Sequence, residues 1–166
     1  MKDKINIGFI GAGNLGRHAI LGLIDSYEIN VSDPMQNQEI LSLGITYISI
    51  EELCKNSDVI FLTIKPNISE EILCKVSDYI DDKLIISFIA GMSLKKLEKL
   101  LSSKNIIRAM PSLGISNGLS PIAVCSNHGV EISSGEKILN KLGRCMEIEE
   151  SKFDAFTSIF GAGPAY

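Results

Sequence analysis

The stretch INIGFIGAGNLGRHAILGLIDSYEINVSD, residues 5–33, decides the fold of this chain. Its first apolar run ends abruptly in glycines with the spacing G-x-G-x-x-G, and these are Gly11, Gly13 and Gly16. A helical pattern follows at once, and a second apolar run, residues 29–31, ends at Ser32 and Asp33. This order predicts a strand, a tight turn, a helix and a second strand with an acidic residue at its tip.

Each glycine of this motif has a mechanical role that another residue type would hinder. Gly11 permits the tight turn, Gly13 lets the backbone approach a pyrophosphate, and Gly16 lets the helix pack on the strand. The free N–H groups at the helix N-terminus attract the phosphates. A plain glycine-rich turn is the alternative, but the flanking strand, helix and acid favour dinucleotide binding.

Length, composition and charge exclude several classes of protein. With 166 residues and 45% apolar content, the chain is expected to form one soluble α/β domain with a short appendage. We expect no membrane partner, because no apolar run reaches the roughly 20 residues of a spanning helix. We also expect no nucleic-acid partner, because the net charge is −4 and no Lys/Arg cluster offsets it.

The four cysteines are scattered, without a C-x-x-C pair or a nearby histidine: Cys54, Cys74, Cys125 and Cys145. Such a pattern is typical of buried thiols in a reducing cytoplasm rather than of metal ligands. The sequence therefore predicts a cytoplasmic protein without a metal site.

Strands and helices are expected to alternate along the rest of the chain. Apolar, β-branched runs predict strands at 45–48, 58–64, 83–89, 105–110, 122–125 and 145–148. Periodic segments predict helices at 14–26, 35–42, 49–56, 94–101 and 131–142, with further helices beginning at Ser69 and Ser151. The predicted fold is α/β, a doubly wound (Rossmann-type), mainly parallel sheet flanked by helices.

Ligands of such sheets bind beyond the carboxyl ends of the strands. In this chain the loops at these ends are expected to lie along the cofactor. Lys65 and Pro66 follow one strand, Ala90 and Gly91 the next, and residues 110–114 a third. The segment 112–121 is predicted to be a functional loop without secondary structure, because it is long and rich in Gly, Ser and Pro.

Several blocks together resemble the pyrroline-5-carboxylate reductase family. They are GFIGAGNLG at 8–16, IKP at 64–66, SFIAGMSL at 87–94, IIRAMPS at 106–112 and GAGPAY at 161–166. The family reduces the cyclic imine 1-pyrroline-5-carboxylate to L-proline with a nicotinamide cofactor. The resemblance implies that this chain is the cofactor-binding part of such an NAD(P)-dependent oxidoreductase acting on a CH–NH bond.

The resemblance also implies where the cofactor binds. The pyrophosphate would lie on Ile10, Gly11, Ala12, Gly13, Asn14, Leu15 and Gly16. The ribose and nicotinamide side would be lined by Thr63, Ile64, Lys65 and Pro66, with Ala90 and Gly91 against the ring and Met110 and Pro111 at the same edge. No catalytic residue is assigned, since hydride transfer to an imine mainly needs placement. Lys65 has a candidate electrostatic role toward phosphate or a substrate carboxylate, with a solvated lysine as the alternative.

The sequence departs from the family in the loops expected to border the substrate, a small molecule. Ser112-Leu113-Gly114 stands where the family usually has Asn-Thr-Pro, and Phe160-Gly161-Ala162 stands where it has Ser-Gly-Ser. Ser112, Gly161 and Gly163 form the predicted substrate-side loop. These changes leave two alternatives open: a non-catalytic dinucleotide-binding regulatory module, or a superfamily reductase acting on another small acid or imine.

The choice between NADH and NADPH depends on Ser32 and Asp33. A carboxylate at the tip of the second strand accepts hydrogen bonds from the ribose hydroxyls of NAD and repels the 2′-phosphate of NADP. The next residues, Pro34, Met35 and Gln36, include no arginine that would bind this phosphate. The predicted cofactor is NAD(P)H, with NADH favoured.

We expect two parts in the chain. Residues 1–150 form the dinucleotide-binding domain, and residues 151–166 begin a linker into a helical dimerisation domain that this chain lacks. The full-length protein is then a homo-oligomer through that domain. An aromatic helix face at Phe153, Phe156 and Phe160 fits a surface covered by the absent part, or else it packs on the sheet.

Overall fold

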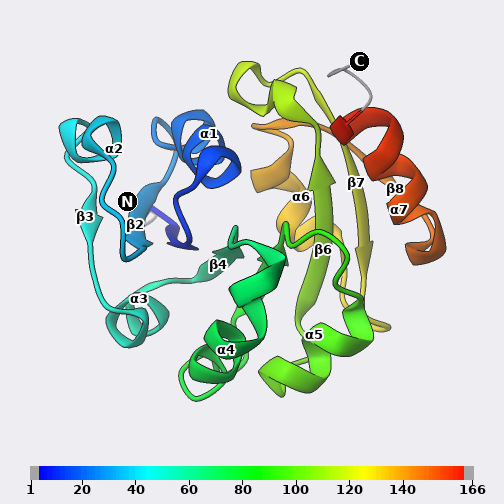
Figure 1. Ribbon diagram of the computed structural model, residues 1–166, viewed down its shortest axis with the longest axis horizontal. Helices are drawn as coiled ribbons and strands as arrows, with labels where there is room; N and C mark the ends of the chain where they lie inside the picture. Colours follow the sequence, from blue (N-terminus) through cyan, green and yellow to red (C-terminus); the bar gives the residue numbers. More distant parts are fainter. Residues whose placement is uncertain (1–3, 163–166) are drawn as a thin grey trace.

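A single eight-stranded sheet organises residues 4–162, the part of the chain that the computed structural model describes (Figure 1). Its strand order is β3-β2-β1-β4-β5-β6-β7-β8. The strands are β1 (Asn6–Ile10), β2 (Glu28–Ser32), β3 (Thr46–Tyr47), β4 (Val59–Leu62), β5 (Leu84–Ser87), β6 (Ile106–Pro111), β7 (Ser120–Ser126) and β8 (Gly143–Glu147). Neighbouring strands from β3 to β6 pair in parallel, β7 is antiparallel to β6, and β8 is parallel to β7. The predicted doubly wound, mainly parallel α/β fold is confirmed.

Helices cover both faces of the sheet. They are α1 (Asn14–Leu23), α2 (Gln38–Ser42), α3 (Ile50–Asn56), α4 (Pro66–Val76), α5 (Leu94–Leu101), α6 (Ser133–Leu139) and α7 (Phe153–Phe156). The buried side chains of α1, α2 and α6 join one core cluster, and those of α3, α4, α5 and α7 join the other. Both faces of the central strands are therefore buried, which explains why β4 is apolar throughout and β5 is apolar up to its last residue, Ser87.

Several elements differ from the sequence prediction in their bounds, and two of these differences concern the helix after β4 and the loop after β6. Helix α4 begins at Pro66 rather than at Ser69, because proline needs no hydrogen-bond partner for its nitrogen at the first helical position. The expected loop 112–121 contains a short 3₁₀ helix, η1 (Leu113–Asn117), and the first residues of β7. The Ser112 hydroxyl accepts a hydrogen bond from the Gly114 N–H at the start of η1.

The segment after β8 packs back onto the sheet. It consists of a 3₁₀ turn, η2 (Glu150–Lys152), then α7, then a π-helical stretch, η3 (Thr157–Ala162). The side chains of Phe153 and Phe156 are buried in the core, so packing on the sheet is the correct interpretation for these two. Ile159 and Phe160 are exposed to 62% and 39%, which leaves an apolar surface at the end of the segment.

The described helices are too short or too polar to cross a membrane. The predicted site residue Gly163 lies outside the described residues, as does most of the GAGPAY block.

Candidate functional site

A cavity of about 490 Å³ opens at the carboxyl ends of β1, β2 and β4. It lies where the strand order reverses, because β1 sits between β2 and β4, and doubly wound sheets bind their ligands at this position. Many of the predicted cofactor residues line it: Ile10, Gly11, Ala12, Gly13, Asn14, Ser32, Asp33, Thr63, Ile64 and Lys65.

The glycine-rich loop at the floor of the cavity has the geometry that its spacing predicts. Gly11 has a φ of +97°, and its N–H donates a hydrogen bond to the Ser32 carbonyl (2.9 Å). A Cβ at Gly16 would meet the Gly11 carbonyl oxygen at 2.6 Å and the Thr63 hydroxyl at 2.7 Å. A Cβ at Gly13 would meet no atom within 4 Å. Gly16, on the first turn of α1, is thus packed against protein, and Gly13 is open toward the cavity, as a pyrophosphate on the helix N-terminus requires.

Asp33 connects this loop to the segment that follows β2. Its Oδ2 accepts a hydrogen bond from the Ala12 N–H (2.7 Å), and its Oδ1 accepts one from the Met35 N–H (2.8 Å). These bonds hold the carboxylate in place beside the cavity. Each carboxylate oxygen has a further lone-pair direction with which to accept a hydrogen bond from a ribose hydroxyl.

Thr63 and Lys65 form the opposite wall. The Thr63 hydroxyl donates a hydrogen bond to the Gly11 carbonyl (2.6 Å), which holds the end of β4 against the glycine loop. Lys65 is the N-cap residue of α4 and lines the cavity.

The remaining predicted residues do not line this cavity. Leu15, Gly16 and Pro66 belong to the elements that support it. Ala90 and Gly91 follow β5, and Met110 and Pro111 end β6, so they lie along the same sheet edge, farther from β1. Their role at the nicotinamide end stays a prediction.

The predicted substrate-side residue Ser112 is engaged with the start of β7. Its N–H donates a hydrogen bond to the Ser120 Oγ (2.7 Å), and the two hydroxyl oxygens are 3.0 Å apart. The backbone of Gly161, the second predicted substrate-side residue, lies in η3.

Sequence reasoning missed other residues that border the cavity, namely Arg17, Asn37, Ile50, Ile68 and Ile72. Arg17 was detectable from its place one residue after the G-x-G-x-x-G motif, on the first turn of α1. Its contact with α2 comes from a segment more than twenty positions away, and no local pattern indicates that contact.

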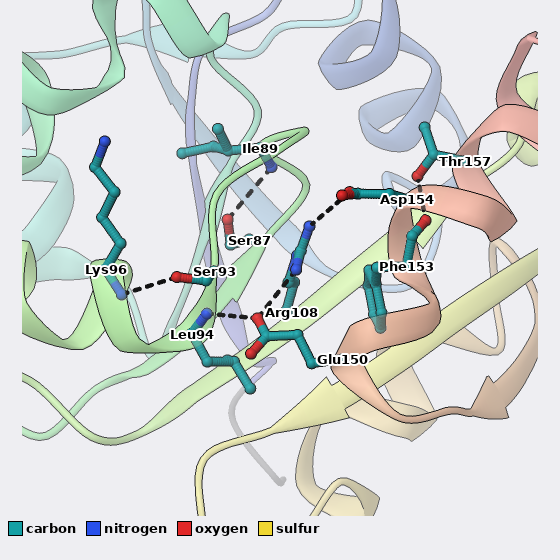
Figure 2. Close-up of polar contacts among 10 residues, drawn as sticks. All are labelled: Ser87, Ile89, Ser93, Leu94, Lys96, Arg108, Glu150, Phe153, Asp154 and Thr157. Carbon is teal, nitrogen blue, oxygen red and sulfur yellow. Dashed lines mark hydrogen bonds and ion pairs between the residues drawn. The ribbon is translucent and has the colours of Figure 1, made fainter.

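A second polar cluster surrounds Arg108 on β6 (Figure 2). The Arg108 side chain is 5% exposed, and its Nη1 donates to the Glu150 Oε1 at 3.0 Å. The same Glu150 oxygen accepts the Leu94 N–H (2.6 Å), at the beginning of α5. The guanidinium also lies 4.5 Å from the centre of the Phe153 ring. Arg108 and Glu150 thereby tie β6, α5 and the C-terminal segment together.

Three thiols have pKa values displaced by their surroundings. Burial raises the pKa of Cys54, Cys125 and Cys145 to about 11, and the nearby Glu150 carboxylate adds to the rise at Cys125. These thiols are protonated at neutral pH. Among residues 4–162, no group of three or more histidine, cysteine or acidic side chains is arranged to hold a metal ion.

Comparison with known proteins places the chain among oxidoreductases. Residues 6–91 match the family described as NADP oxidoreductase, coenzyme F420-dependent. A pyrroline-5-carboxylate reductase of Aquifex aeolicus is 36% identical over 172 residues, covering 98% of this chain and 64% of the relative. The structure of the Plasmodium falciparum pyrroline carboxylate reductase with NADP bound superimposes with a TM-score of 0.89 at 29% identity, covering all of this chain and 65% of that one. The reductase of Coxiella burnetii superimposes with a TM-score of 0.87 at 26% identity.

Proposed function

We propose that this chain, which belongs to the family of NADP oxidoreductases described as coenzyme F420-dependent, is the cofactor-binding part of an enzyme that reduces 1-pyrroline-5-carboxylate to L-proline. The basis is its similarity to pyrroline-5-carboxylate reductases, which extends over 98% or more of this chain. The resemblance to the pyrroline-5-carboxylate reductase family that the sequence motifs indicate is confirmed. The observation that supports the proposal most directly is the open face of Gly13 on a cavity at the reversal of strand order.

The chain spans 64% of the length of its Aquifex relative, so the proposed activity is that of the whole protein. We propose that residues 1–150 are the dinucleotide-binding domain and that residues 151–166 lead into a helical dimerisation domain. The exposed Ile159 and Phe160 side chains support a continuation of apolar packing at this end. A homo-oligomer formed through that domain is part of the proposal.

The proposed chemistry needs placement more than it needs acid or base groups. When bound, a reduced nicotinamide supplies the hydride, and the imine carbon is already electrophilic. The loop from Ile10 to Gly16 and the N-terminus of α1 hold the pyrophosphate in the proposed complex. The Lys65 ammonium at the opposite wall adds positive charge for a phosphate or for a substrate carboxylate.

We propose that NADH is the preferred cofactor, because the Asp33 carboxylate is fixed beside the cavity where the adenosine ribose is expected. Isothermal titration calorimetry with both dinucleotides tests this preference. Tighter binding of NADH is expected, and tighter binding of NADPH would contradict the assignment of Asp33. A reducing cytoplasmic location is proposed as well, and the four free cysteines support it.

The activity is tested by the oxidation of NADH and NADPH by 1-pyrroline-5-carboxylate, using the full-length protein. Turnover to proline is expected. Cofactor binding without turnover would overturn the proposed reaction and favour one of two other functions. These are a dinucleotide-binding regulatory module and a reductase of another small acid or imine, and the Ser112-Leu113-Gly114 departure favours both. A panel of small cyclic imines and keto acids then separates these two.

A further inference from the structure

Arg17 is a cation at the end of the cavity where the adenosine ribose is expected. It lies on the first turn of α1 and lines the cavity together with Asp33, Met35 and Asn37. The 2′-phosphate of NADPH would be carried by this ribose, beside Asp33. A guanidinium is the side chain that binds a phosphate best, because its planar fork makes two parallel hydrogen bonds. In isolation, Arg17 would therefore favour NADPH.

The structure shows Arg17 engaged elsewhere. Its Nη1 donates to the Glu39 Oε2 on α2 at 2.5 Å. Its Nη2 lies 3.1 Å from the His18 Nε2. The Arg17 side chain is 26% exposed, so this ion pair is partly shielded from water. Both terminal nitrogens of the guanidinium thus have a partner within the protein, and each keeps only one further N–H with which to bind a ligand. The ion pair with Glu39 also holds the guanidinium toward α2 and offsets its charge.

The charges around this end of the cavity also favour NADH over NADPH. Asp33 and Glu39 each carry a negative charge, and Arg17 balances only one of them. A 2′-phosphate would add roughly two more negative charges at pH 7, as other phosphate monoesters do. To bind it through Arg17, the protein would have to break the Glu39 pair and leave that carboxylate without its partner.

We propose that Glu39 is a specificity-determining residue that withholds Arg17 from the 2′-phosphate of NADPH and so favours NADH. The inference rests on the proposed dinucleotide binding. It adds a second determinant to Asp33, which acts through direct contact with the ribose. Glu39 lies in α2, outside the residues that line the cavity, and acts through Arg17.

The test is calorimetric binding of NADH and NADPH to the full-length protein and to its Glu39→Gln variant. Glutamine keeps the shape of the side chain but removes the charge that holds Arg17. We expect NADPH to bind about tenfold more tightly to the variant, equivalent to about 1.4 kcal/mol, while NADH affinity changes less than about twofold. The gain in NADPH affinity should shrink as salt is raised, since it comes from a charge pair near the surface.

The matched control is Glu28→Gln. Glu28 is also exposed and paired with a cation, Lys4, but it lies at the other end of β2. It alters the net charge equally, so a shift toward NADPH in this variant would overturn the specific role of Glu39. Should Glu39→Gln fold poorly by circular dichroism, Glu39→Ala serves as the second variant with the same expected direction.

A double-mutant cycle separates the proposed role from a merely structural one. Arg17→Met in the Glu39→Gln background should abolish the gain in NADPH affinity, because the freed guanidinium is its source. Unchanged relative affinities in Glu39→Gln, with both dinucleotides binding to the wild type, would overturn the inference alone. Absence of binding of either dinucleotide to the wild type would overturn the proposed function as well.

Discussion

At the scale of single residues, the Arg108–Glu150 pair is an asymmetric source of stability. Arg108 is almost completely buried, whereas the Glu150 side chain is 34% exposed. Removal of one partner from a buried ion pair is costly when the other charge stays buried. Removing Glu150 therefore leaves the buried Arg108 guanidinium without its nearest partner, because among the described residues the only other carboxylate beside it, that of Asp154, is 4.0 Å away.

We predict that Glu150→Gln lowers the free energy of unfolding by about 3 kcal/mol and Arg108→Met by about half as much. Glutamine still accepts the hydrogen bond of the Leu94 N–H, so the difference reports on the charge. Urea unfolding of both variants measures this order. Glu149→Gln, on an exposed carboxylate paired with Lys152, is the control and should change little. Equal losses in the two test variants would contradict the asymmetry.

Residues were predictable from the sequence where their role is local. Asp33, Gly11 and Gly13 have roles that depend on a few neighbouring positions, and all three line the cavity. The ion pairs of Arg17 and Arg108 were not predicted from the sequence. Their carboxylate partners lie 22 and 42 positions away, so the fold alone brings them together.

At the scale of elements, the N-terminus of α1 has one glycine expected to matter for binding and another expected to matter for stability. Gly13 is its N-cap residue, and Gly16 lies on its first turn. A Cβ at Gly16 would collide with the Gly11 backbone and the Thr63 side chain, whereas one at Gly13 has free space. Gly13 has an ordinary φ of −66°, which alanine adopts without strain. The two glycines therefore respond differently to the same substitution.

We predict that Gly16→Ala lowers the free energy of unfolding by about 2 kcal/mol through steric overlap. Gly13→Ala should change it by less than about 1 kcal/mol. The same Gly13→Ala should weaken NADH binding at least about tenfold, because the methyl group occupies space in which the backbone approaches the pyrophosphate. Thermal unfolding and calorimetry measure the two effects. Undiminished binding by Gly13→Ala would mean that the pyrophosphate lies elsewhere.

Elements with strong periodicity were predicted closely, and those governed by turn chemistry were not. The strongly amphipathic helix α5 spans Leu94–Leu101, the same residues as predicted. The stretch 112–121 has no apolar period, so the sequence indicates a loop. Side-chain hydrogen bonds of Ser112 and Ser120 nevertheless stabilise η1 and allow β7 to begin early.

At the scale of the whole molecule, the buried thiols make stability depend on alkaline pH. The pKa of Cys54, Cys125 and Cys145 is raised to about 11 in the folded state, against an ordinary value of 9.0. Below pH 9 these thiols are protonated in both the folded and the unfolded state. Between pH 9 and 11 the unfolded chain binds fewer protons than the folded one, so the stability falls as the pH rises.

We predict that the free energy of unfolding decreases from pH 9 to pH 11, with each thiol contributing at most about 1.4 kcal/mol per pH unit. Urea unfolding at pH 8, 9 and 10 measures the slope. Cys125→Ala should reduce the slope, whatever its effect on stability at pH 8. Cys74→Ala, which removes an exposed thiol, is the control. A slope that Cys125→Ala leaves unaltered would contradict the role of this thiol.

The class of fold was predictable from the alternation of apolar runs and periodic segments. The reversal of β7 was not, because an antiparallel strand and a parallel strand of similar burial look alike in sequence. The connection from β6 to β7 is too short for the crossover that a parallel strand needs, so β7 has to be antiparallel. The sequence pattern does not show how short this connection is, because it does not mark where β7 begins.

That reversal has a practical consequence for attaching the protein to a surface or a label. Strand β1 begins at Asn6, at the sheet edge opposite the glycine loop, so an N-terminal tether leaves the cavity facing solution. Because β7 and β8 run the other way, β8 ends and α7 begins beside Arg108, which is level with the carboxyl ends of β1, β4 and β5. The red segment in Figure 1 leads on from there toward the end of β6. A biosensor or affinity resin built on this chain is therefore better anchored at its beginning than through its last helix.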